Sequence, residues 1–376
     1  MSETERFSLK DHLFNEGKVR GVAKQIKAVC PAFKDKEFVR VVVRKFPELE
    51  LMERIGFIAE SLRASLPGDY EEALAILLTS LPPPCDPTLS DNDFGDFIYA
   101  PFGHFVSVYG CEKRYLKVSL AALREITQRF SAEWAIRRFL NEYPKETLSE
   151  LRTWTKDSHY HVRRLVSEGT RPNLPWAKKV NLIPEDTLPL LELLYTDKTR
   201  FVTRSVANHL NDLAKTNPSL VIDTLKRWQK GGLQSESELT FISKHALRTL
   251  VKRGDKEALA LLGYQSNKVV VESIEIQTPT VRVGESLVFI VRLRSTDKTT
   301  QSFVIDYVID FMKANGSTTP KVHKLATRTL KPGEHVSLCK KHPLRVMSTR
   351  KLYSGTHTIT IQVNGIMFPS QSFLLY

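Results

Sequence analysis

Two glutamates and a tryptophan are the residues of this sequence whose types best suit a reaction at a positively charged centre. Glu168 ends a predicted helix directly before Gly169, which should hold its carboxylate at the lip of a groove. Glu133 begins another predicted helix, which Ser131 should cap, and Trp176 follows a proline-containing loop that should fix its indole. Carboxylates offset positive charge, an indole attracts cations through its π-face, and paired carboxylates cleave glycosidic bonds. These three are therefore candidate catalytic residues.

Each of the three also has a purely structural interpretation. Glu133 can act on its helix dipole alone, and Glu168 can pair with Arg163 or Arg171. Most tryptophans lie in a core, so Trp176 can be a packing residue. The residues alone leave these alternatives open.

The sequence indicates neither a metal site nor a cofactor site. His159 and His161 have a spacing that a metal could use, but no further Cys, His or Asp cluster completes a site. The four cysteines are scattered and form no CxxC pair, so we interpret them as reduced thiols. There is also no phosphate-binding glycine loop and no nucleophile elbow. We expect no metal ion and no cofactor.

These residues lie in a predicted helical body that is followed by a β-domain. From about residue 8 to 264, apolar residues recur at three- and four-residue spacing, which is typical of amphipathic helices. From about Val269 the period changes to two, with turn signals between the runs, which predicts an immunoglobulin-like sandwich. We expect a mainly α fold, with a HEAT-like helical-repeat solenoid at 1–265 and a small all-β immunoglobulin-like sandwich at 266–376.

The helical body contains an internal repeat that places several arginines. Residues 157–168 align with residues 197–208 at an offset of 40 residues, within the range of HEAT-type helix pairs, and a fainter copy follows at 245–250. An Asp should cap each repeat helix. Stacked repeats form a concave surface, along which Arg164, Arg204 and Arg248 would recur. Alternatively, these arginines cap helix ends or pair with acids of the next repeat.

The charge of the chain favours DNA as its partner. The net charge is +13, and such an excess attracts polyanions. A basic stripe on a concave wall matches a duplex backbone better than a protein partner. From residue 267 on, 15 Lys and Arg face 7 Asp and Glu, a net +8, so the basic loop at 340–345 should contact DNA unless it is a solvated hairpin tip. The candidate DNA-binding residues are Arg163, Arg164, Arg171, Lys178, Lys179, Arg200, Arg204, Asn208, Arg248, Lys340, Lys341 and Arg345.

The N-terminus and the hydropathy pattern argue against secretion and against a membrane span. The first residues are polar and lack the apolar core of a signal peptide. No apolar run approaches the roughly 20 residues that cross a bilayer. We therefore expect a cytoplasmic protein without a membrane partner.

One segment links the sequence to a known family. The string Ser-Glu-Gly-Thr-Arg-Pro-Asn-Leu-Pro-Trp at 167–176 follows His-Val-Arg-Arg-Leu-Val at 161–166, and Ala-Glu-Trp-Ala-Ile-Arg lies upstream at 132–137. With the second repeat at 197–208, these motifs resemble the AlkC branch of the AlkC/AlkD bacterial DNA alkylation-repair glycosylases. The resemblance covers the whole helical body, and an immunoglobulin-like C-terminal domain also occurs in AlkC members. The string at 167–176 is specific, whereas HEAT repeats by themselves are not.

The resemblance implies a monofunctional DNA glycosylase of base excision repair that acts on cationic N3-alkylated bases, such as 3-methyladenine and 3-methylcytosine. Glu133 and Glu168 would face the deoxyribose, one of them aligning or deprotonating water and both offsetting charge. Trp176 would pack against the sugar. The family is expected to leave the base in the duplex, whereas most glycosylases flip it out. The implied partner is double-stranded DNA with alkylated bases, bound by a monomer at the bacterial nucleoid.

Two other functions stay open at this point. The chain can be a non-enzymatic HEAT-repeat DNA-binding protein whose carboxylates are structural. It can also be a protein–protein scaffold, which is the usual role of HEAT arrays.

Overall fold

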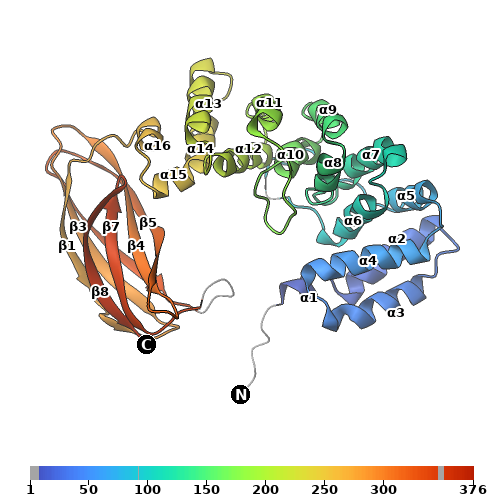
Figure 1. Ribbon diagram of the computed structural model, residues 1–376, viewed down its shortest axis with the longest axis horizontal. Coiled ribbons are helices and arrows are strands. Elements are labelled where there is room, and N and C mark those ends of the chain that lie inside the picture. The colour runs from blue at the N-terminus through green and yellow to red at the C-terminus, as the bar shows by residue number, and fades with distance from the viewer. Residues whose placement is uncertain (1–7, 92, 346–350) are drawn as a thin grey trace. The chain divides into compact units, whose positions relative to one another are not determined.

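The computed structural model describes residues 8–91, 93–345 and 351–376 and shows helices followed by strands (Figure 1). The last helix ends at Leu261 and the first strand begins at Val269. The prediction of a mainly α chain, with a helical solenoid before an all-β sandwich, is therefore confirmed. The chain divides into two compact units, Met1–Leu213 and Ala214–Tyr376. The domain boundary at 265/266 stays a prediction.

The first unit consists of helices, most of which bury one apolar face. In α10, Val162 and Leu165 are completely buried, and Val202 and Val206 are buried in α12 in the same way. Three- and four-residue steps put such positions on one face, and α10 and α12 lie side by side. The helices of this unit are α1 (Leu9–Leu13), α2 (Glu16–Val29), α3 (Asp35–Lys45), α4 (Leu51–Ser65), α5 (Tyr70–Thr79), α6 (Ala100–Tyr109), α7 (Leu116–Ile126), α8 (Ile136–Glu142), α9 (Pro144–Trp154), α10 (Tyr160–Gly169), α11 (Pro184–Leu194) and α12 (Arg200–Leu213), with 3₁₀ helices η1 (Phe46–Glu48), η2 (Phe97–Tyr99) and η3 (Lys113–Tyr115).

The acids that open the two copies of the repeat form turns ahead of the helices. Asp157 accepts a hydrogen bond from the backbone N–H of His159 at 2.8 Å, and Asp197 accepts one from the N–H two residues further on, also at 2.8 Å. The N-cap of α10 is His159, so the prediction that Asp157 caps this helix is wrong. A short Asp side chain reaches the N–H two residues on, which closes a turn before the helix starts. Arginines then bind both acids: Arg124 donates to Asp157 at 2.6 Å and Arg163 to Asp197 at 2.5 Å.

The second unit joins four helices to a two-sheet sandwich. One sheet has the order β1-β3-β6 and the other β2-β8-β7-β4-β5. Their inner faces bury Phe289, Tyr307, Ile359 and Phe373, as expected for alternating strands of an immunoglobulin-like domain. The elements are α13 (Pro218–Gly231), α14 (Glu236–Ala246), α15 (Arg248–Lys252), α16 (Lys256–Leu261), β1 (Val269–Ile276), β2 (Thr280–Val281), β3 (Ser286–Ser295), β4 (Gln301–Met312), β5 (Thr318–Leu330), β6 (His335–Pro343), β7 (Gly355–Val363) and β8 (Ile366–Leu375).

Two glycines let the helices of this second unit touch its sandwich. Gly254 follows α15, Gly365 lies in the turn between β7 and β8, and both have a positive φ, of 75° and 81°. A Cβ on Gly365 would lie 2.4 Å from the Cα of Gly254. Gln362 adds a hydrogen bond from Nε2 to the carbonyl of Lys252 at 3.2 Å. A side chain at either glycine would therefore force the helices away from the sheet.

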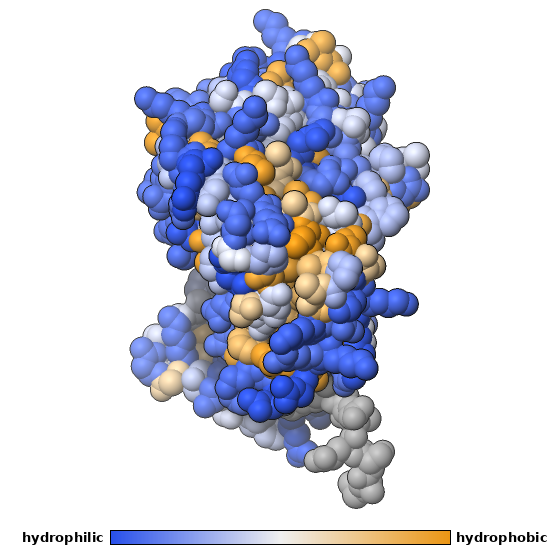
Figure 2. Space-filling view, turned by 90° about the vertical axis from the view of Figure 1, so that its right-hand side faces the viewer, coloured by the Kyte–Doolittle hydropathy of each residue, from blue (hydrophilic) through white to orange (hydrophobic). Residues whose placement is uncertain are grey.

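Apolar side chains also reach the surface of the first unit. Figure 2 shows the side that lies at the right of Figure 1, where hydrophobic residues gather between hydrophilic regions. A hollow of about 570 Å³ in this unit is lined by Phe38 and Val41 of α3 and Phe57 of α4. Among the described residues, no helix is both long enough and apolar enough to cross a bilayer.

Candidate active site

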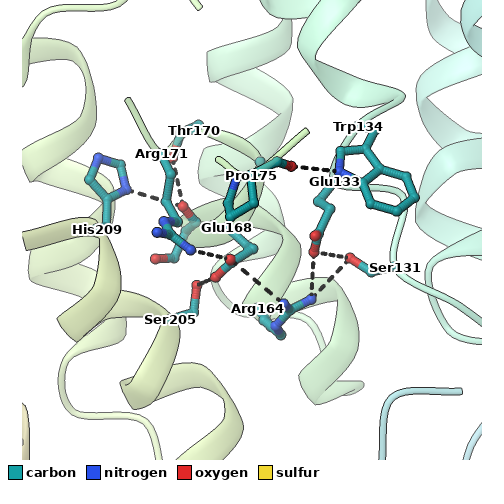
Figure 3. Close-up of polar contacts among 12 residues, drawn as sticks. Ser131, Glu133, Trp134, Arg164, Glu168, Thr170, Arg171, Pro175, Ser205 and His209 are labelled. Carbon is teal, nitrogen blue, oxygen red and sulfur yellow. Dashed lines mark hydrogen bonds and ion pairs between the residues drawn. The ribbon is translucent and has the colours of Figure 1, made fainter. Parts of the chain in front are cut away.

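One guanidinium, that of Arg164, contacts both candidate glutamates (Figure 3). Its Nη1 donates to Oε2 of Glu133 at 2.9 Å, and its Nη2 lies 3.8 Å from Oε1 of Glu168. The guanidinium also lies over the ring of Phe201, 4.6 Å from the centroid. Burial would lower the pKa of Arg164, but the carboxylates of Glu133 and Glu168 outweigh burial and raise it. Two acids far apart in the sequence therefore meet at one permanent cation.

Glu168 lies inside the protein and both its carboxylate oxygens are bound. Only 5% of the residue is exposed. Oε1 accepts from Nη1 of Arg171 at 2.6 Å, and Oε2 accepts from Oγ of Ser205 at 2.7 Å. Burial would raise the pKa of Glu168, but Arg164, Arg171 and these hydrogen bonds lower it, so the carboxylate is ionised. The prediction of a carboxylate at the lip of a groove is wrong, because α12 packs over the end of α10 and supplies Ser205.

Glu133 is the more accessible of the two acids. It lies in the turn before α8, and its side chain is half-buried. Ser131 does not cap a helix there, since its hydroxyl donates to Oε2 of Glu133 at 2.7 Å and the N-cap of α8 is Ala135. In the part of the chain that the structure describes, the contacts of this carboxylate all fall on Oε2. Oε1 is therefore left to bind a water molecule or a ligand.

Trp176 is exposed on the loop that follows α10. Its exposed fraction is 75%, so the alternative that it fills a core is excluded. Its φ is 57°, a backbone conformation that costs free energy in a bulky residue and persists only when the surroundings fix it. The carbonyl of Pro175, directly before it, accepts from Nε1 of Trp134 at 3.3 Å. Trp134 directly follows Glu133 in the chain, so this bond ties the loop that carries Trp176 to the turn that carries Glu133.

Two residues of α8 hold the rest of this loop, and sequence reasoning missed both. Arg137 donates to the carbonyls of Gly169 at 3.0 Å, Arg171 at 2.8 Å and Lys178 at 2.5 Å. Arg137 is 1% exposed. Its burial, and to a smaller extent the charge of Arg171, lowers the pKa of Arg137 to about 10. Asn141, one turn further along α8, donates to the carbonyl of Lys179 at 3.0 Å. We call Trp134, Arg137 and Asn141 the loop clamp. Contacts to backbone carbonyls leave no pattern in a sequence, so nothing signalled it.

The loop clamp and Trp176 border a solvent-filled hollow of about 590 Å³. Lys178 and Arg138 lie on its wall and are exposed, so cations line the hollow beside the two indoles. Indoles offer flat apolar faces to a sugar or a base, and the cations attract phosphate. The arrangement suits a strand of DNA that runs along the loop clamp.

Comparisons with known proteins place the chain in a family. Residues 119–250 match the family model described as DNA alkylation repair enzyme, and residues 270–376 match that of the C-terminal Ig-like domain of the uncharacterised protein YhaZ. The chain is 34% identical to the uncharacterized protein YhaZ of Bacillus subtilis, over 96% of this chain and 98% of that protein. It also matches the structure of the Pseudomonas fluorescens alkylpurine DNA glycosylase AlkC bound to DNA containing an abasic site analogue. That match has a TM-score of 0.88 and 33% identity, over 98% of this chain and 100% of the other. The chain belongs to the AlkC branch of the DNA alkylation repair enzymes.

In this AlkC-family chain, several arginines predicted to bind DNA are engaged by acids of the protein. Arg163 forms its ion pair with Asp197, and Arg204 forms one with Asp91. Arg171 is buried, and its Nε donates to Asp212 at 3.0 Å. In the structure these arginines therefore pair with acids, as the alternative interpretation of the repeat arginines proposed. Their binding to DNA stays a prediction.

Other predicted DNA-binding residues outside the β-domain are more accessible. Lys178 and Lys179 are exposed on the loop of Trp176, and Arg200 and Asn208 of α12 are half-buried. Arg248 begins α15 in the second unit. Whether Arg248 shares a face with Arg164 and Arg204 therefore stays a prediction, as does the contact of all these residues with DNA.

The basic segment of the β-domain is a strand and not a loop. Lys340 and Lys341 lie in β6, paired with Phe289 and Val288 of β3. Adjacent strand residues point to opposite faces, so Lys341 is exposed while Lys340 is half-buried. Arg345 follows the strand and is exposed. The prediction of a loop at Lys340 and Lys341 is thus wrong, because the alternating pattern continues into β6, and the DNA contact of these three residues stays a prediction.

Proposed function

We propose that this protein is a monofunctional DNA glycosylase that hydrolyses the N-glycosidic bond of cationic N3-alkylated bases in duplex DNA, 3-methyladenine and 3-methylcytosine among them. The match to the alkylpurine DNA glycosylase AlkC supports this proposal along almost the whole chain. The observation that carries it is the meeting of Glu133 and Glu168 at Arg164, next to the clamped loop that bears Trp176.

The proposed reaction needs little acid catalysis. An N3-alkylated base already carries a positive charge, so the bond from C1′ to the base breaks with its electron pair going to the base, which leaves as a neutral molecule. The positive charge then develops on the deoxyribose. Ionised carboxylates in a partly buried site stabilise that charge more than water does. A water molecule adds to C1′ and gives up a proton, which completes the hydrolysis.

We assign different roles to the two glutamates. Glu133 has an oxygen, Oε1, that is left for a water molecule, so it is proposed to align the attacking water and accept its proton. Glu168 uses both oxygens inside the protein. It is proposed to act as a positioning residue, because it holds Arg164 and Arg171 and adds negative charge behind Glu133. Trp176 is proposed to pack against the deoxyribose of the lesion.

The first experiment measures base release from duplex DNA with one N3-methylated base, at low and physiological salt. The proposal expects free methylated base and an abasic site that breaks only after alkali, since a monofunctional enzyme hydrolyses the bond without cutting the strand. An unmethylated duplex serves as the control. DNA binding without base release would leave the non-enzymatic DNA-binding function. If the protein neither binds DNA nor releases a base, a protein–protein scaffold is the function that remains.

A second experiment tests whether the base stays in the duplex. A flipped base must fit a pocket, so bulky N3 substituents should be rejected by a flipping enzyme. If the base stays stacked, as we propose, bulky N3 adducts are released at rates similar to the methyl adduct. Loss of release with adduct size would contradict excision without flipping.

We also propose that the protein is a monomer and that it acts at the nucleoid. The molar mass in solution tests the first claim, and the position of a fluorescent fusion in bacterial cells tests the second.

A further inference from the structure

Three potential metal ligands that are far apart in the sequence meet at the start of α10. Cys85 and Asp93 lie in the segment 80–96 that joins α5 to η2, and His161 lies in the first turn of α10. One ligand atom from each, a sulfur, a carboxylate oxygen and a ring nitrogen, lies within 4.8 Å of the other two. The pair His159 and His161 lacked further ligands along the sequence, and the fold supplies them from a segment about 70 residues upstream.

His161 provides a second, independent observation. The residue is 2% exposed, and its Nε2 is buried without a hydrogen-bond partner among the described residues. A buried ring nitrogen without a partner loses its hydrogen bond to water and gains none in return, and such an atom in a native fold calls for an explanation. A nitrogen of a neutral imidazole is also a common metal ligand. A bound cation would satisfy it.

The backbone around the three ligands is held in place. Nε2 of His159 hydrogen-bonds to the carbonyl of Cys85 at 3.0 Å, and its Nδ1 accepts from the N–H of His161 at 3.2 Å. Both nitrogens of His159 are thus used, which leaves His161 as the ligand. The N–H of Gly95 donates to Oδ1 of Asp93 at 3.1 Å. Such supporting hydrogen bonds orient ligands in known metal sites.

We propose that Cys85, Asp93 and His161 bind a divalent ion of the zinc class, with water as the fourth ligand. Sulfur, imidazole and carboxylate together suit zinc or cobalt better than magnesium or calcium. Binding replaces the proton of the Cys85 thiol, which passes to solvent. The usual zinc–ligand bonds put neighbouring ligand atoms about 3.5 Å apart. The three ligand atoms, which lie within 4.8 Å of one another, therefore need at most a small adjustment to bind one ion.

The site lies at the other end of α10 from the candidate active site, so we assign it to the stability of the fold and not to base excision. His161 and Glu168 are seven residues apart, or about 10 Å along a helix. The segment 80–96 also carries Asp91, which pairs with Arg204, and Ser90, whose carbonyl accepts from the N–H of Phe201 at 2.9 Å. The ion thus fastens this segment across the starts of α10 and α12. The inference does not depend on the proposed glycosylase function.

Metal binding to the full chain tests the proposal. Protein stripped with a chelator is titrated with Zn²⁺, and with Co²⁺ as a spectroscopic probe, whose thiolate ligand gives a charge-transfer absorption. We expect one equivalent per chain, a thiolate–cobalt band, and a melting temperature several degrees higher with zinc than without it. Failure to bind Zn²⁺ at micromolar free concentration would overturn the proposal.

Matched variants locate the ion. Cys85→Ser should abolish the thiolate–cobalt band and the zinc-dependent rise in melting temperature, while Cys111→Ser, which removes a buried thiol elsewhere, should keep both. Asp93→Asn, at a half-buried position, is a second test in case a change at buried His161 unfolds the protein. A band that persists in Cys85→Ser and disappears in Cys339→Ser would mean surface binding and would overturn the site.

Discussion

Arg164 determines how the two glutamates behave before DNA arrives. Its guanidinium holds one oxygen of Glu133 and approaches Glu168, so the carboxylates stay together without repelling each other. A cationic lesion would bring a second positive charge to Glu133, which already shares its charge with Arg164. The buried Glu168 and the half-buried Glu133 are thus held together where, in the proposed reaction, positive charge appears on the sugar.

Glu133→Gln tests the role of the accessible acid. Glutamine keeps the size of the side chain but neither accepts the proton of water nor offsets the sugar cation. We expect the single-turnover rate of base release to fall by about 10²–10⁴-fold, with DNA affinity nearly unchanged. The control is Glu71→Gln, an exposed acid on α5, which should keep the full rate. A wild-type rate in Glu133→Gln would refute the assignment of Glu133.

Glu168→Gln should act first on stability. The substitution removes the acid that Arg171 and Arg164 share and leaves them Asp212 and Glu133, which costs about 2–3 kcal/mol. Urea denaturation measures this loss in the free energy of unfolding. Ser205→Ala removes one hydrogen bond to the same carboxylate and should cost only about 1 kcal/mol. If Glu168→Gln abolished base release with full stability, Glu168 would be a catalytic residue and the positioning role would be wrong.

At the scale of elements, α8 positions the loop that carries Trp176. Asn141 binds the loop at two points, as donor to the carbonyl of Lys179 and as acceptor from the N–H of Asn181 at 3.1 Å. Asn141→Ala removes both bonds, so hydrogen exchange of residues 171–181 should accelerate and base release should slow. The global free energy of unfolding should change by only about 1–2 kcal/mol.

Asn141→Asp separates the two bonds, because aspartate still accepts from Asn181 but cannot donate to Lys179. Exchange and activity should fall between the wild type and Asn141→Ala. Unchanged exchange at 171–181 in Asn141→Ala would show that Asn141 does not hold the loop.

The packing of α12 against α10 makes stability depend on pH through His209. Burial is the main reason why the pKa of His209 is lowered to about 4 from its usual 6.5, and the charge of Arg171 adds to this effect. The charges of Asp212 and Glu168 oppose it. The unfolded chain therefore binds this proton below pH 6.5 and the folded chain only below about pH 4. The free energy of unfolding should decrease as the pH falls through this window, by about 3 kcal/mol for this residue. His209→Gln should flatten the pH profile of urea midpoints, and His12→Gln, at an exposed position, should not.

The sequence predicted the elements better than their interior contacts. Apolar periodicity and the 40-residue repeat indicated that α10 and α12 are equivalent helices of neighbouring repeats. The burial of Glu168 could not be seen from the sequence, because its partner Ser205 comes from the next repeat, as does Asp212, which binds its other partner, Arg171. Arg137 could not be recognised either, since its partners are backbone carbonyls, which every residue has. Side-chain patterns report which face is apolar, and not which polar groups meet across it.

At the scale of the whole molecule, cations are concentrated toward the C-terminal end of the chain. If the β-domain contacts DNA as predicted, Lys341→Ala with Arg345→Ala should lower the slope of log K against log salt by about 0.9 for each phosphate that the double variant no longer neutralises. Lys331→Ala, at an exposed turn of the same domain, is the matched control. An unchanged slope in the double variant would show that these two cations do not bind the DNA backbone.

The exposed position of Trp176 gives the protein a built-in optical probe. Of the four tryptophans, Trp154 and Trp228 are 2% exposed and Trp134 is half-buried, while Trp176 is 75% exposed. An indole in water emits at longer wavelength than one in a core, so the long-wavelength part of the emission comes mainly from Trp176. Stacking against a nucleoside would quench that emission. Unlabelled protein and unlabelled DNA would then suffice for stopped-flow recordings, with Trp176→Phe as the background.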